Sequence, residues 1–123
     1  MRVNPVGWFE IYVQDMNRAK PFYEGVLQVQ LEKLEGPGFE MWAFGMDPEK
    51  MGASGSLVQA ECVASGGNST LVYFSCEDCA QEESRVVQFG GKVERTKMSI
   101  GPYGFISLAL DPDGNMIGFH SMK

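Results

Sequence analysis

The sequence predicts a single α+β domain over residues 1–123, built from two βαβββ modules. A strand pattern followed by a helix pattern occurs near the N-terminus and again after residue 69, and three shorter strand patterns follow each helix. The two halves also match locally, because Val13-Gln14-Asp15 stands where Cys76-Glu77-Asp78 stands in the second half. We expect module one at about 5–62 and module two at about 69–121. With a helix on one side only, each mixed sheet can curl around a cleft, with the helices on the outer face.

The first module opens with a strand over 7–13 that alternates between two faces. One face carries Phe9, Ile11 and Val13, and the other carries Trp8, Glu10 and Tyr12. Asp15 is expected to cap a helix over 16–26, and Pro21 inside that pattern predicts a shortened or kinked helix. Strands are expected at 27–34, 39–46 and 56–60, with a turn at 35–38 and a linker at 64–69.

The second module repeats this order, with a strand over 71–76 and a helix that begins after Asp78. The apolar stripe of this helix is Cys79, Val86, Val87 and Phe89, and Gly90-Gly91 ends it. Strands follow at 93–98 and 103–110, and a turn at 111–114 leads into the last one. In that last strand Gly118 and His120 share the face opposite Ile117 and Phe119.

The composition is that of a soluble globular domain, with 44% hydrophobic and 21% charged residues. A net charge of −6 argues against nucleic-acid binding and is compatible with a neutral or cationic small ligand. The sequence contains neither the ~20-residue apolar run of a membrane helix nor a secretion signal. Three cysteines are an odd number, so we expect a reducing cytoplasm rather than a disulfide framework.

Several segments together resemble the vicinal oxygen chelate superfamily, which includes glyoxalase I, bleomycin-resistance proteins and extradiol dioxygenases. They are Phe9-Glu10-Ile11-Tyr12-Val13-Gln14-Asp15 with Arg18-Ala19 and Phe22-Tyr23, Val72-Tyr73-Phe74 with Glu77-Asp78, Gly90-Gly91-Lys92-Val93, and Asp111-Pro112-Asp113-Gly114-Asn115 with Ile117-Gly118. The resemblance implies paired βαβββ modules around a cleft, often in a homodimer.

The resemblance also implies four metal-ligand positions, on strands one, four, five and eight. In this chain they fall on Trp8, at or beside Leu71, on Gly118, and within Ser56-Leu57-Val58, where the alignment leaves the choice open. A divalent metal needs about three or more oxygen or nitrogen donors. An indole, a leucine and a glycine supply none, so we expect no metal and no other cofactor.

Glu10 and His120 are the polar residues best placed to act in the cleft. Glu10 is either a ligand-orienting acceptor or general base, or a solvated or dimer-paired carboxylate. His120 is either a proton shuttle or half of a two-ligand metal site with Glu10, or a surface or interface residue.

A set of aromatic residues is expected either to line a pocket for a planar or cationic molecule or to pack in the core or a dimer interface. It consists of Trp8, Tyr12, Trp42, Tyr73 and Tyr103.

The Cys76-Glu77-Asp78-Cys79 segment is a CxxC motif. Because Cys76 continues the apolar face of its strand, we interpret it as core rather than as a redox site.

The leading hypothesis is a homodimeric protein that binds a neutral or cationic organic compound without a metal, using Trp8, Glu10, Tyr12, Tyr73 and His120. A second hypothesis is a glyoxalase-like lyase or isomerase with an atypical metal site at Glu10 and His120. A third is an association domain whose own side chains fill its cleft.

Overall fold

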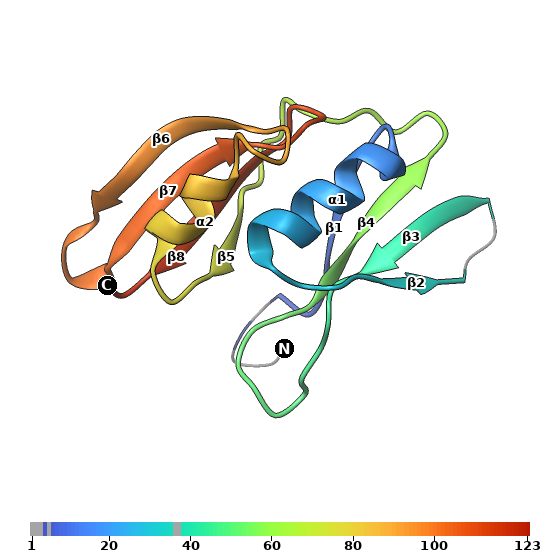
Figure 1. Ribbon diagram of the computed structural model, residues 1–123. Coiled ribbons are helices and arrows are strands. Elements are labelled where there is room, and N and C mark those ends of the chain that lie inside the picture. The colour runs from blue at the N-terminus through green and yellow to red at the C-terminus, as the bar shows by residue number, and fades with distance from the viewer. Residues whose placement is uncertain (1–3, 5, 36–37) are drawn as a thin grey trace.

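The computed structural model describes residues 4, 6–35 and 38–123, and it divides them into two modules with the same order of elements (Figure 1). Module one contains β1 (Phe9–Tyr12), α1 (Met16–Leu27), β2 (Glu32–Leu34), β3 (Phe39–Ala43) and β4 (Gly55–Ala60). Module two contains β5 (Val72–Ser75), α2 (Cys79–Arg85), β6 (Lys92–Ser99), a short 3-10 turn η1 (Gly101–Tyr103), β7 (Phe105–Leu110) and β8 (Met116–Ser121). The predicted α+β class with two βαβββ modules is therefore confirmed.

Each module forms its own four-stranded mixed sheet, in the orders β1-β4-β3-β2 and β5-β8-β7-β6. The β1–β4 and β5–β8 pairs are parallel, whereas the other pairs are antiparallel. The first strand of each module is thus an edge strand. Both helices lie on the same side of the two sheets, as Figure 1 shows.

Helix α1 begins where the sequence predicts, because the Asp15 side chain accepts a hydrogen bond from the Asn17 N–H at 3.0 Å. Its apolar stripe is fully buried and consists of Met16, Ala19, Phe22, Tyr23 and Val26. The prediction that Pro21 shortens the helix is wrong, since twelve residues are helical. Pro21 lies on the exposed face, where burial of the opposite stripe outweighs one missing N–H donor.

Helix α2 also begins at its predicted cap, where Asp78 accepts from the Ala80 N–H at 3.0 Å. Lys97 lies 2.9 Å from the same carboxylate oxygen, and these hydrogen bonds lower the pKa of Asp78. The helix ends at Arg85, earlier than predicted. Val87 therefore lies after the end of the helix and does not follow its periodicity. Its side chain is 70% exposed, so the prediction that it belongs to the buried stripe is wrong.

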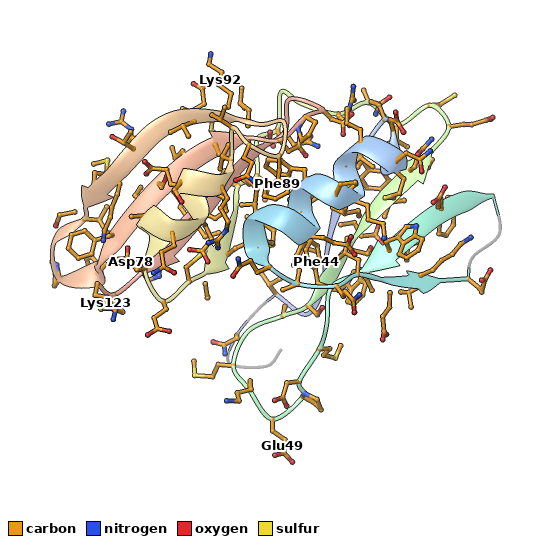
Figure 2. The ribbon with its side chains drawn as sticks, viewed as in Figure 1. Phe44, Glu49, Asp78, Phe89, Lys92 and Lys123 are labelled. Atoms are coloured by element: carbon orange, nitrogen blue, oxygen red, sulfur yellow. The ribbon has the colours of Figure 1, made fainter. Side chains whose placement is uncertain are left out.

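One hydrophobic core joins the two modules. Phe9 and Phe44 of module one lie within 5.9 Å and 5.6 Å of the Phe74 ring of module two, measured between ring centroids. Phe89, which follows α2, packs against Gly25 of α1, and Figure 2 shows it beside that helix. The two modules therefore pack against each other through a shared core and are not joined by a linker alone.

Several irregular segments differ from expectation. Strand β2 starts only at Glu32, because Gln28 adopts a left-handed conformation with φ of 55° and closes α1. The 64–69 segment, predicted to be a linker, is fixed by hydrogen bonds from Ser65 to the Tyr12 carbonyl and from the Gly66 N–H to Asn115. Part of the predicted 35–38 turn, residues 36–37, lies outside the described residues. Within the described residues, helices long and apolar enough to cross a membrane do not occur.

Candidate functional site

The edge strands β1 and β5 border two cavities, and we call the space between these strands the seam. The larger cavity has a volume of about 700 Å³, and its lining includes Val6, Trp8, Met51, Leu71 and Tyr73. The smaller one has a volume of about 360 Å³, and its lining includes Glu10, Tyr12, Thr70, Asn115 and Met116. Phe9 and Val72 border both cavities. The seam is therefore a hollow between the two modules that is walled mainly by apolar groups.

Glu10 is held on one face of β1 by the two aromatic residues that flank it. The Tyr12 hydroxyl donates to one carboxylate oxygen at 2.8 Å, and the Trp8 indole N–H lies 3.4 Å from the other oxygen. The hydrogen bond to the carboxylate raises the pKa of Tyr12, with burial and the charge of Glu10 adding to the effect. Glu10 therefore presents a fixed acceptor and negative charge at the seam.

Tyr73 lies against Gly118, one of the four positions at which the family resemblance implies a metal ligand. It is the register partner of Gly118, across the parallel β5–β8 pair. A Cβ atom on Gly118 would lie 2.3 Å from Cδ1 of the Tyr73 ring. The ring, which is 44% exposed, thus lies against bare backbone and forms a wall of the larger seam cavity.

His120 and Tyr103 contact each other, away from both seam cavities. The Nε2 atom of His120 lies 2.7 Å from the Tyr103 carbonyl oxygen. Neither side chain lines a seam cavity, and Tyr103 is 72% exposed. The structure therefore does not bring His120 to Glu10 as the two-ligand hypothesis requires.

Trp42 lies on the opposite face of its sheet from Trp8, Glu10 and Tyr12. Its indole N–H donates to Glu40 at 2.9 Å, and the Lys20 ammonium of α1 lies 4.5 Å from its ring centre. It is the register partner of Leu57, a core residue, which explains why it faces the helix. The expected aromatic set is thus divided, with Trp8, Tyr12 and Tyr73 at the seam and Trp42 and Tyr103 elsewhere.

Residues from the connection between modules and from the last turn also line the seam, and the sequence analysis missed them. Asn115 donates to the Tyr12 carbonyl at 2.9 Å and accepts from the Gly66 N–H at 2.7 Å. It thereby fastens module two to the end of β1. Its place at the end of the Asp-Pro-Asp-Gly turn was a usable signal, whereas nothing in the local pattern marked Thr70 or Met116.

The structure narrows the position left open on strand four to two residues. Leu57 points into the core, whereas Ser56 and Val58 pair in register with Glu10 and Tyr12 and so lie on the same face as these two residues. The Ser56 hydroxyl is fully buried and has no hydrogen-bond partner among the described residues. Among all the residues that the structure describes, no three His, Cys, Asp or Glu side chains lie close enough together to hold a metal ion.

The sequence profile described as Glyoxalase/Bleomycin resistance protein/Dioxygenase superfamily matches residues 5–119. The chain belongs to this superfamily. No curated protein matches it significantly. Among solved structures of the same fold, glyoxalase I from Zea mays superposes with a TM-score of 0.74 at 22% identity, covering 96% of this chain and 46% of that one. The chain thus spans about half the length of the maize enzyme.

Two further structures match this superfamily member over nearly their whole length. TnmS3, an antibiotic-binding protein from Streptomyces sp. CB03234, has 25% identity and a TM-score of 0.71, with 98% of both chains covered. A glyoxalase/bleomycin resistance protein from Albidiferax ferrireducens T118 has 17% identity and a TM-score of 0.69, covering 94% of this chain and 98% of that one.

Proposed function

We propose that this superfamily member binds a neutral or cationic organic molecule in the seam, without metal-dependent chemistry. The observation that carries the proposal is the cavity of about 700 Å³ walled by Trp8 and Tyr73. Its volume lies in the range of small-molecule sites, which are mostly apolar with a few fixed polar groups. The full-length similarity to the antibiotic-binding protein TnmS3 supports the same class of function.

Each seam residue has a separate role in this proposal. The rings of Trp8 and Tyr73 provide flat apolar surfaces for a planar compound and favourable faces for a cation. Glu10 supplies an acceptor for an N–H or O–H group, or a countercharge for an ammonium group. Tyr12 fixes the carboxylate through its 2.8 Å hydrogen bond, so that less rotamer freedom is lost on binding.

The metal-free part of the proposal rests on the chemistry of the residues at the expected ligand positions. Trp8, Leu71 and Gly118 offer no side-chain donor that a divalent ion could use. The Tyr73 ring also fills the space beside Gly118 into which a ligand side chain would project. A single buried serine hydroxyl, that of Ser56, does not make a donor set. Metal-assisted isomerase or dioxygenase chemistry therefore does not fit this site.

The test is a thermal-shift screen of metabolites and antibiotics, followed by calorimetry on each compound that raises the melting temperature. A compound that binds only the native state adds about 2.7 kcal/mol at 100 times its Kd. Trp8→Ala and Glu10→Gln should each weaken binding at least tenfold. Tyr103→Ala, which removes an exposed aromatic residue outside the seam, should leave it unchanged.

Two results would contradict the proposal. One is a screen in which the seam variants and wild type bind every active compound equally. The other is purified protein that retains a stoichiometric transition metal and loses it in His120→Ala, which would favour the enzyme hypothesis.

We also propose that the protein forms a homodimer. The test is size-exclusion chromatography with light scattering on the eluted protein, over a series of protein concentrations.

A further inference from the structure

The two cavities of the seam adjoin each other along β1 and β5. Phe9, Thr70 and Val72 line both cavities and so form their common border. We call the cavity of about 700 Å³ the large lobe and the cavity of about 360 Å³ the small lobe. Both lie along strands whose outer edges carry no further strand of their own sheet, so a ligand that extends past the common border can occupy both lobes.

The two lobes differ in charge and polarity. Among the described residues, none that lines the large lobe carries a charged side chain. Its apolar groups are largely exposed, with Trp8 at 39%, Tyr73 at 44% and Met51 at 91%. Covering such surface with a planar apolar group is favourable. In the small lobe, by contrast, Glu10 is the one charged side chain among the described lining residues.

The negative charge of Glu10 is accessible, and no cation of the described chain neutralises it. The residue is exposed and lines the small lobe, so a ligand in that lobe can reach it. Its two hydrogen-bond donors, the Tyr12 hydroxyl at 2.8 Å and the Trp8 indole N–H at 3.4 Å, are both neutral. Within the described residues, no lysine or arginine forms an ion pair with it.

The carboxylate of Glu10 can also accept further hydrogen bonds. An ionised carboxylate has about four acceptor positions, of which the two neutral donors use at most two. An ammonium group is the donor that adds most here, because its hydrogen bond to a carboxylate is charge-assisted. The net charge of −6 also favours the approach of a cation.

We infer that the seam prefers a monocationic compound with a planar apolar group at one end and an ammonium group at the other. The planar group occupies the large lobe against Trp8 and Tyr73, and the ammonium group binds Glu10 in the small lobe. This inference rests on the proposed seam function and narrows its ligand class from neutral or cationic compounds to cationic amphiphiles of this form.

Calorimetry with 4-phenylbutylammonium, and with 4-phenylbutan-1-ol and 4-phenylbutanoate as uncharged and anionic analogues, tests the inference. We expect the ammonium compound to bind at least tenfold more tightly than either analogue. Glu10→Gln, which keeps an acceptor for the Tyr12 hydroxyl, should bring the affinities of the ammonium compound and the alcohol to within threefold of each other. Trp8→Ala should weaken both compounds, because it removes a contact with their common planar group.

A matched control removes the same charge from the same sheet face. Glu32 lies in the register row that runs through Ala43 and Ser56 to Glu10, three strands away, and it lines neither lobe. Glu32→Gln should leave the affinity of 4-phenylbutylammonium unchanged. Ala64 is exposed and lines only the small lobe, so Ala64→Trp should obstruct that lobe and reduce the preference for the ammonium compound as Glu10→Gln does.

The outcomes separate this inference from the proposed function. If the ammonium compound and the alcohol bind wild type equally and Trp8→Ala weakens both, the seam binds ligands but the preference for a cation is wrong. The preference is equally wrong if it persists in Glu10→Gln, or if 4-phenylbutylammonium does not bind at millimolar concentration. If neither Trp8→Ala nor Glu10→Gln changes the affinity of any compound that binds, both the inference and the proposed function fail.

Discussion

The ring of Tyr73 lies against the backbone of Gly118, close enough that the smallest possible side chain on Gly118 would overlap it. The added Cβ would be 2.3 Å from Cδ1 and 2.4 Å from Cε1 of the ring. This contact links two facts about the seam. Gly118 offers no metal ligand, and its lack of a side chain permits the aromatic wall that the proposed ligand site needs.

Gly118→Ala should therefore displace the Tyr73 ring. We expect a loss of about 1–3 kcal/mol in the free energy of unfolding, the usual cost of overpacking, measured by urea denaturation. Tyr73→Ala in the same chain should remove most of that loss, because the clash disappears. A double-mutant cycle measures this coupling. Gly7→Ala is the control, since no atom lies within 4 Å of a Cβ there, and additivity of the two seam substitutions would contradict the prediction.

Gly25→Ala should reverse the usual effect of this substitution. In an exposed helix interior, replacing glycine with alanine stabilises a protein by about 1 kcal/mol. Here the added Cβ would lie 2.4 Å from Cδ1 of Phe89, so we expect net destabilisation in thermal or urea unfolding. In a Phe89→Ala background the same substitution should become stabilising. A stabilising Gly25→Ala in the otherwise wild-type chain would show that Phe89 moves aside without cost.

Much of the fold could be predicted because its signals are local. Asp15 and Asp78 cap their helices as expected, and the alternation in β1 and β8 assigns Ile11, Ile117 and Phe119 to the core. Where the prediction was wrong, tertiary packing prevailed. Helix α1 continues through Pro21 because its opposite face is buried, and this is not visible in the local pattern.

The site was harder to predict because it depends on which faces and edges meet. Alternation correctly grouped Trp8, Glu10 and Tyr12 on one face of a strand, and the structure places all three beside the seam cavities. It could not show that Trp42 faces α1, since both faces of β3 carry apolar residues. Nor could it show that the segment around Gly66 docks on Asn115, because that contact joins residues far apart in the chain.

The cysteines should differ strongly in reactivity. Cys62 is exposed, whereas the raised pKa of Cys76, about 12, leaves almost no thiolate at pH 8, and Cys79 is fully buried. Brief treatment with iodoacetamide, followed by peptide mass spectrometry, should modify Cys62 at least tenfold faster than Cys76. Glu82→Gln removes one cause of the shift and should speed modification of Cys76. Rapid modification of Cys76 in the native wild type would instead support a redox function for the CxxC motif.

Tyr23 should make stability fall steeply at alkaline pH. Its buried hydroxyl donates to Asp111 at 2.7 Å, and burial first, then the negative charge of Asp111, raises its pKa well above 10. The folded state thus holds this proton to higher pH than the unfolded state does. The resulting stability is complete below about pH 10, the pKa of an unfolded tyrosine, and is lost as pH rises further.

Tyr23→Phe separates this contribution from other titrations. At pH 7 we expect a loss of about 2 kcal/mol, the typical value for a hydrogen bond to a charged group. Between pH 9 and 11 the variant should lose less stability than wild type, so that the difference between the two proteins narrows in urea unfolding. Tyr103→Phe, at a side chain that is 72% exposed, should follow the wild-type curve. A Tyr23 pKa that is higher in the native state than in the unfolded state requires the two curves of unfolding free energy against pH to converge above pH 9. If wild type and Tyr23→Phe instead lose stability in parallel, the Tyr23 proton is not linked to folding.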